Sequence, residues 1–112
     1  MIKTLRQFAL QNNPMHFLPL LQVPEILSSM VQLEELLIDG NKIKILPNFL
    51  GNFSKLRHLD ASFNQLEVIC PEIGHCSNLV DLTLSSNDLK VGGYFANVMK
   101  CIWCRLRNLG SN

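Results

Sequence analysis

Cys101 and Cys104 form a Cys-x-x-Cys motif, the feature of this 112-residue chain that points most directly to metal or redox chemistry. Such a pair can act as a thioredoxin-like dithiol or supply half of a tetrahedral zinc site. The redox interpretation needs a thioredoxin-like fold around the pair, which the rest of the sequence does not predict. The zinc interpretation needs two more ligands; Cys70, His75 and Cys76 are of suitable type, but no second Cys-x-x-Cys occurs. A zinc- or redox-dependent module therefore stays an alternative, and we expect no cofactor.

A second cluster of reactive side chains consists of Glu35, His58 and Asp81, which follow one another at equal intervals along the chain. If these positions stack on neighbouring parallel strands, they lie about 4.8 Å apart. A histidine between two carboxylates could support acid–base catalysis. A flat sheet excludes no water from such a group, and no glycine-rich phosphate loop accompanies it. We therefore expect no enzymatic activity and interpret the cluster as part of a solvated binding surface.

The elements that must position this cluster are copies of a 23-residue repeat. Its three clearest copies begin at Leu33, Leu56 and Leu79. In each copy, apolar residues occupy positions one, four, six and eleven, and asparagine occupies position nine. Because side chains alternate between the two faces of a strand, positions four and six point into a core and positions three and five point away from it. The pattern predicts an α/β fold, a short leucine-rich-repeat solenoid with parallel strands on its concave face.

A further repeat is predicted ahead of these three, with a longer spacing. Its residues at positions one, four, six, nine and eleven are Leu5, Phe8, Leu10, Asn13 and Met15. This copy is longer than the others by five residues, and we place the surplus in a bulge on the convex or loop side. The repeat region is predicted to span residues 1–90. Its copies are 5–32, 33–55, 56–78 and a partial copy at 79–90.

The asparagines at position nine are predicted to be structural. They stand where the chain leaves each strand with unpaired backbone groups, and a side-chain amide can both donate and accept hydrogen bonds there. We expect them to form a ladder along the solenoid, made of Asn13, Asn41, Asn64 and Asn87.

The second half of each repeat is predicted to be helical or irregular and to form the convex side. Pro47 and Pro71 fix φ at the beginning of these segments, which suits an extended or helix-starting turn. Cys76 falls where Phe53 falls one repeat earlier, so we expect it to be a small buried core residue. Without a visible secretory signal, we expect reduced cysteines rather than disulfides.

The repeat string, shown best by residues 33–41 and 71–74, resembles the intracellular 23-residue class of leucine-rich repeats. Similar repeats occur in Scribble-, Erbin-, Lano- and densin-like proteins and in Ras-pathway scaffolds, and the resemblance covers about residues 5–90. It implies a cytoplasmic signalling scaffold that binds protein partners on its concave face. Those families usually carry many more repeats. A truncated fragment of a longer scaffold, with little binding of its own, is therefore a further alternative.

The predicted concave face is acidic and carries exposed apolar side chains. Position seven contributes Ser62 and Asp39, and position eight contributes Phe63. The residues expected to contact a partner are Glu35, Leu37, Asp39, His58, Asp60, Phe63, Asp81 and Thr83. Acidic groups around an aromatic anchor favour a basic, partly apolar segment of a partner protein.

The repeat pattern ends at Gly92-Gly93, and residues 91–112 are predicted to be a helical cap and tail. Apolar residues recur at helical spacing over 94–109, and an open solenoid end needs a covering element. The alternative is a basic amphipathic helix that meets another protein or a membrane.

Composition gives no sign of other partner classes. The formal net charge is +1, which provides no general attraction to nucleic acid or membrane. No signal peptide is visible, and no stretch approaches the ~20 apolar residues of a transmembrane helix. We expect a cytoplasmic protein without a nucleic-acid partner.

Overall fold

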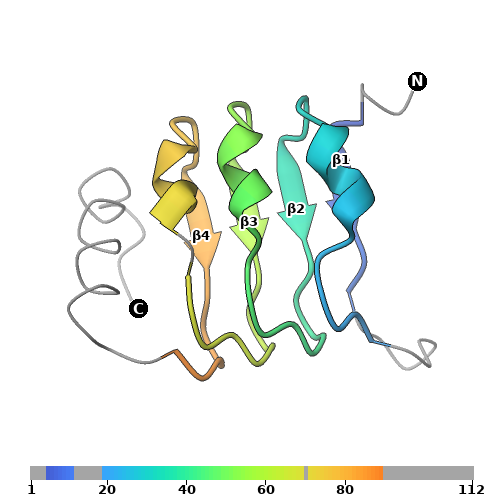
Figure 1. Ribbon diagram of the computed structural model, residues 1–112, viewed down its shortest axis with the longest axis vertical. Helices are drawn as coiled ribbons and strands as arrows, with labels where there is room; N and C mark the ends of the chain where they lie inside the picture. The colour runs from blue at the N-terminus through green and yellow to red at the C-terminus, as the bar shows by residue number, and fades with distance from the viewer. Residues whose placement is uncertain (1–4, 12–18, 70, 90–112) are drawn as a thin grey trace.

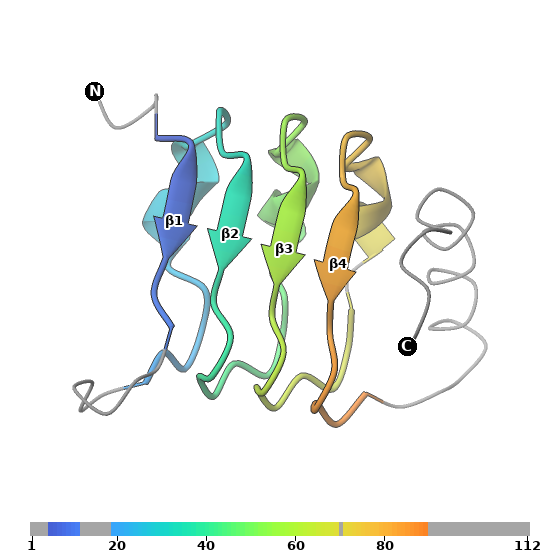
Figure 2. The ribbon, with the colours of Figure 1, turned by 180° about the vertical axis from the view of Figure 1, so that it is seen from behind.

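Four short parallel strands lie side by side in one sheet, in the order in which they occur along the chain (Figure 1, Figure 2). The computed structural model describes residues 5–11, 19–69 and 71–89. The strands are β1 (Gln7–Ala9), β2 (Glu35–Leu37), β3 (His58–Asp60) and β4 (Asp81–Thr83). Consecutive strands of a parallel sheet need a crossover, and the described part of each crossover contains a short 3-10 helix. These helices are η2 (Glu25–Ser29), η3 (Asn48–Asn52) and η4 (Pro71–His75).

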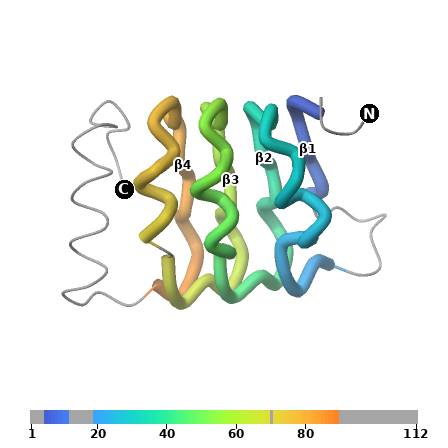
Figure 3. The backbone as a smooth tube through the Cα atoms, turned by 45° about the horizontal axis from the view of Figure 1, so that its top comes forward, coloured from blue at the N-terminus to red at the C-terminus, as the bar shows by residue number. Residues whose placement is uncertain are grey.

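The three helices lie side by side on one face of the sheet, so that each strand and the following helix form one turn of a solenoid (Figure 3). Prolines fix these turns as expected, since Pro24 and Pro47 directly precede η2 and η3, and Pro71 is the first residue of η4. The open parallel sheet and the solenoid arrangement predicted from the repeat are confirmed.

Strand pairing follows the predicted register. Glu35 pairs with His58, and His58 pairs with Asp81, as the constant length of these repeats predicts. Gln7 pairs with Glu35 across the longer first repeat. Position three of each repeat therefore forms one row across the sheet, and position five forms a second row of Ala9, Leu37, Asp60 and Thr83.

The core lies between the sheet and the 3-10 helices. Leu36 and Ile38 are fully buried, whereas Leu37 between them is only half-buried on the other face. This is the alternation expected of a strand with one buried face. On the helix side, Leu50 and Cys76 are fully buried, and the Cys76 thiol lies 3.1 Å from the Leu50 carbonyl oxygen.

Asn41, Asn64 and Asn87 make the same hydrogen bonds in successive repeats. Asn64 Nδ2 donates to the carbonyl of Ala61 in its own repeat at 3.0 Å and to that of Ile38 in the preceding repeat at 3.1 Å. Its Oδ1 accepts from the N–H of Ile43 at 3.1 Å. The asparagine thereby bonds backbone groups of two adjacent turns. Asn41 also donates to the Ile38 carbonyl and Asn87 to the Ala61 carbonyl, so each of these carbonyls is shared by the asparagines of two repeats. Asn13 lies outside the described residues.

Leu20, and not Met15, takes position eleven of the first repeat. The Leu20 N–H donates to Asn41 Oδ1 at 2.7 Å, which is the bond that Ile43 makes to Asn64 one repeat later. The Lys42 N–H donates to the Leu20 carbonyl at 2.8 Å, again as in the following repeats. The five surplus residues therefore precede Leu20 in the chain, and from there on the 23-residue period is regular.

The predicted C-terminal helical cap and tail, residues 91–112, lie outside the described residues. So do Cys101 and Cys104 with their Cys-x-x-Cys motif, and Cys70. Among the residues that the structure does describe, no helix has the length and apolarity that crossing a membrane requires.

Candidate functional site

The candidate site is the sheet face turned away from η2, η3 and η4, which we call the open face. It corresponds to the predicted concave face. Position three places Glu35, His58 and Asp81 side by side on it, and position five adds Leu37, Asp60 and Thr83. Asp81 and Thr83 at one edge are exposed, whereas the residues on the two middle strands are half-buried.

The carboxylates of the open face are held in place by neighbouring side chains. Gln7 Nε2 donates to Glu35 Oε1 at 2.8 Å, and His58 Nδ1 forms an ion pair with Asp81 when the imidazole is protonated. His58 is therefore not shared between two carboxylates, because Glu35 is engaged by the strand on its other side. The row predicted from sequence is continuous in register but divided into two pairs.

The remaining two acids are oriented in the same way. Gln11 Nε2 donates to Asp39 Oδ1 at 2.6 Å. Asp60 Oδ1 accepts from the Ser62 N–H at 3.0 Å and from the Ser62 hydroxyl at 2.7 Å. Ser62 is buried, at 5% exposure, although strand alternation predicts it on the surface. Its hydroxyl turns back to Asp60, so it supports the carboxylate and offers nothing to a partner.

Phe63 follows β3 in a turn that bulky residues rarely adopt. Its φ is 54°, in the left-handed region, and the equivalent residues Gly40 and Ser86 have φ of 77° and 56°. Backbone bonds stack these turns, since the Gly40 N–H donates to the Ser62 carbonyl and the Phe63 N–H donates to the Ser85 carbonyl, each at 3.0 Å. An aromatic residue held at positive φ stores about 1–3 kcal/mol of backbone strain. Nevertheless 64% of its surface is exposed, so burial of the ring does not compensate for the strain.

Sequence reasoning identified Phe63 as exposed but missed its backbone conformation. The available signal was Gly40, which occupies the same repeat position one turn earlier. Of the two predicted apolar anchors, Phe63 is far more accessible than the half-buried Leu37.

The described residues contain no metal site. Within ranges 5–11, 19–69 and 71–89, no three side chains of His, Cys, Asp or Glu come together in a way that could hold a metal ion.

Two stretches of the chain, residues 32–53 and 55–76, match the family model described as Leucine Rich Repeat. The fold is a leucine-rich-repeat solenoid. No curated protein is significantly similar to the chain in sequence. The assignment to the intracellular 23-residue class stays a prediction.

Solved leucine-rich-repeat structures resemble the chain more extensively. An LRR protein of Leptospira interrogans is 34% identical with a TM-score of 0.70, over 78% of this chain and 21% of that one. Internalin C2 of Listeria monocytogenes is 25% identical with a TM-score of 0.57, over 69% of this chain and 33% of that one. A chain in the structure of the Toll–Spätzle complex of Drosophila is 25% identical with a TM-score of 0.61, over 79% of this chain and 15% of that one. This chain thus spans between 15% and 33% of the length of these chains.

Proposed function

We propose that the chain is a non-enzymatic protein-binding module whose open face receives the partner, and that it serves as a signalling scaffold in the cytoplasm. Leucine-rich repeats generally mediate protein–protein interaction, and their fold is typically that of a non-enzymatic interaction module. In the structure similar to this one, Toll is in complex with Spätzle. That likeness supports a protein ligand in general and names none for this chain.

The observation that carries this proposal is the conformation of Phe63. A strained backbone persists only where the surrounding structure enforces it, and such positions concentrate at binding and switch sites. Here the stacked turns enforce a left-handed φ, and the residue that occupies it is a large, exposed aromatic. Glycine or serine suffices at the same position in the neighbouring repeats, so the fold itself does not require the ring. Binding a partner gives the ring a role that folding does not.

The acids around the sheet support a basic partner. Each of Glu35, Asp39 and Asp60 has one carboxylate oxygen engaged by its own chain and a second oxygen without a partner among the described residues. Carboxylates fixed in this way need little reordering when they meet a lysine or arginine. A basic segment with one apolar anchor for Phe63 fits this face. Charge then contributes mainly to the association rate, and burial of the ring contributes mainly to a slow dissociation.

The proposal is tested by isolating a partner with the full chain and measuring its binding by surface plasmon resonance at two ionic strengths. Phe63→Gly removes the ring and is compatible with the turn, because Gly40 already occupies it. We expect it to weaken binding by about 1–2 kcal/mol or more. Asp81→Lys should slow association and flatten its dependence on salt.

Matched controls lie away from the open face. Leu21→Ala removes an apolar side chain that is 72% exposed, and Glu67→Lys reverses an exposed charge. Both should bind like the parent. If Phe63→Gly and Asp81→Lys also bind like the parent, the open face is not the partner site.

A second candidate is a segment of a longer leucine-rich-repeat scaffold with little binding of its own. It is favoured by the small share of each similar structure that this chain spans, 15% to 33%. It predicts that no partner is retained by the full chain in isolation, although circular dichroism shows cooperative melting.

A further inference from the structure

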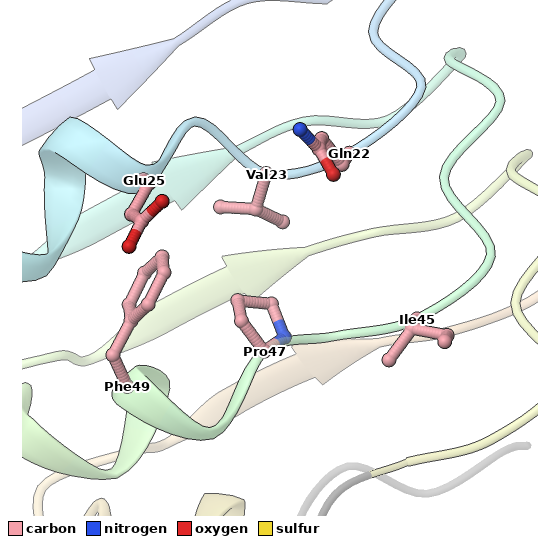
Figure 4. A pocket seen from close by; sticks show the side chains of 6 residues that line it. All are labelled: Gln22, Val23, Glu25, Ile45, Pro47 and Phe49. Atoms are coloured by element: carbon pink, nitrogen blue, oxygen red, sulfur yellow. The ribbon is translucent and has the colours of Figure 1, made fainter.

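A second surface feature lies on the convex side, in a groove between η2 and η3. Its volume is about 370 Å³. Figure 4 shows Val23 and Glu25 from the first of these turns facing Pro47 and Phe49 from the next, with Gln22 and Ile45 at one end. Val23 is buried and forms part of the core, so the groove has an apolar floor. None of these residues belongs to the open face.

The groove exists because two equivalent repeat positions carry different residues. Gly51 on η3 faces η4 so closely that a methyl group there would lie 2.9 Å from the Glu72 carbonyl oxygen. Ser28 occupies the same repeat position on η2 and is half-buried, and its side chain adds a Cβ and a hydroxyl that glycine lacks. Accordingly η3 and η4 pack together more extensively than η2 and η3 do. The helix pair that contains serine instead of glycine is the pair with the groove.

Exposed apolar side chains extend the groove at one end. Ile45 is 62% exposed and pairs in parallel with Val68, which is 48% exposed. Two neighbouring β-branched aliphatic side chains at the mouth of an apolar groove enlarge its water-accessible apolar area. Covering this area with apolar groups of a ligand is favourable in proportion to the surface removed from water.

Among the described residues that line the groove, Glu25 carries the formal charge. It is exposed, and it forms no ion pair or hydrogen bond with any residue in the described ranges. A carboxylate beside an apolar surface is complementary to a cationic group linked to an apolar one. Small-molecule sites usually have several convergent polar groups, which the described lining of this groove lacks. Its size is at the low end of ligand sites, roughly 300–1,000 Å³, which suits one or two side chains of a peptide.

We propose that the groove between η2 and η3 docks a peptide segment of a second protein, in which an aliphatic or aromatic residue lies next to a lysine or arginine. The apolar side chain fills the space between Val23, Pro47 and Phe49. The basic side chain pairs with Glu25, and flanking residues cover Ile45. This surface is separate from the open face, so the solenoid can hold two proteins at once.

The test uses the full chain and a phage-displayed library of random short peptides, followed by fluorescence polarisation with the selected peptides made synthetically. We expect the selected peptides to share an apolar residue adjacent to lysine or arginine. Ile45→Ser should weaken them about tenfold, the usual effect of removing a substantial apolar contact. Phe63→Gly, on the open face, should leave their affinity unchanged.

A charge exchange at Glu25 tests the electrostatic part without disturbing the core. Glu25→Lys should weaken the basic peptides by roughly threefold or more, and should strengthen the same peptides when glutamate replaces their basic residue. If Ile45→Ser does not fold, the comparison of Glu25→Lys with the parent still tests whether the peptides bind in the groove. The proposal is overturned if no common sequence emerges, if both variants bind like the parent, or if binding depends on Phe63 instead. It is also overturned if sedimentation shows a dimer of this chain that Ile45→Ser dissociates, because the occupant is then a second copy.

Discussion

Replacing Gly51 with alanine should destabilise the fold, whereas the same replacement at Gly74 should not. The two glycines occupy the same position of successive repeats, in η3 and η4, and neither has a left-handed φ. A Cβ at Gly51 would lie 2.9 Å from the Glu72 carbonyl oxygen and 3.0 Å from Glu72 Cβ. A Cβ at Gly74 would meet no atom of the described residues within 4 Å. The pair therefore isolates the effect of packing between adjacent helices.

The magnitude follows from two opposing contributions. Alanine restricts the unfolded chain more than glycine does, which stabilises either variant by about 0.4–1 kcal/mol. At Gly51 the obstacle is backbone, so η4 must move as a unit, and overpacking of this kind typically costs about 1–3 kcal/mol. We therefore expect Gly51→Ala to lose up to about 2.5 kcal/mol and Gly74→Ala to gain up to about 1 kcal/mol.

The assay is guanidinium unfolding of both variants, followed by far-ultraviolet circular dichroism. The slope of the free energy of unfolding against denaturant should stay that of the parent, so that a shifted midpoint reports stability alone. Equal midpoints for the two variants, or a more stable Gly51→Ala, would refute the close approach of η3 and η4. The explanation of the groove between η2 and η3 would then be lost as well.

Three further predictions concern the sheet and its turns. Leu59→Ala empties a buried core site and should lower the free energy of unfolding by about 2–5 kcal/mol, whereas Leu37→Ala on the open face should lower it by less than about 1 kcal/mol. Equal losses for the two variants in denaturant melts would show that the two faces of the sheet are assigned wrongly. Asn64→Ala leaves the buried Ile43 N–H without its acceptor, whereas the Ile38 and Ala61 carbonyls keep Asn41 and Asn87 as donors. We therefore expect a loss of about 1–3 kcal/mol in the same assay, against no measurable change for the neighbouring control Gln65→Ala. Phe63→Gly should keep the free energy of unfolding within about 1 kcal/mol of the parent. Relief of backbone strain stabilises the folded state, and the greater conformational freedom of glycine stabilises the unfolded chain by a similar amount. A larger loss of stability would mean that the ring contributes to the fold.

Much of the fold could be predicted because the repeat carries its own periodicity. An apolar residue at positions four and six must face a core, since strand side chains alternate between faces. A constant interval then fixes which residues become neighbours, as it does for Glu35, His58 and Asp81. The asparagine at position nine is placed by the same logic, because a buried turn needs a side chain that both donates and accepts.

Where the interval changes, the sequence alone left a choice. Spacing alone placed Met15 at position eleven, and Leu20 is another apolar residue five positions later. The structure decides for Leu20, because only a backbone N–H at the right distance can donate to Asn41 Oδ1. A hydrogen bond between residues 21 positions apart in the chain has no signature in local spacing.

For the open face and the groove, too, some features follow from the sequence and others only from the tertiary structure. The sequence by itself determined that Glu35, Asp39, Asp60 and Phe63 share a solvated side of the molecule, since repeat register controls the direction of each side chain. Only the tertiary structure decided which groups hold these carboxylates, that Phe63 sits in a left-handed turn, and that a groove opens between η2 and η3. Those outcomes depend on side-chain reach, backbone angle and the packing of adjacent turns, which are set when the repeats stack.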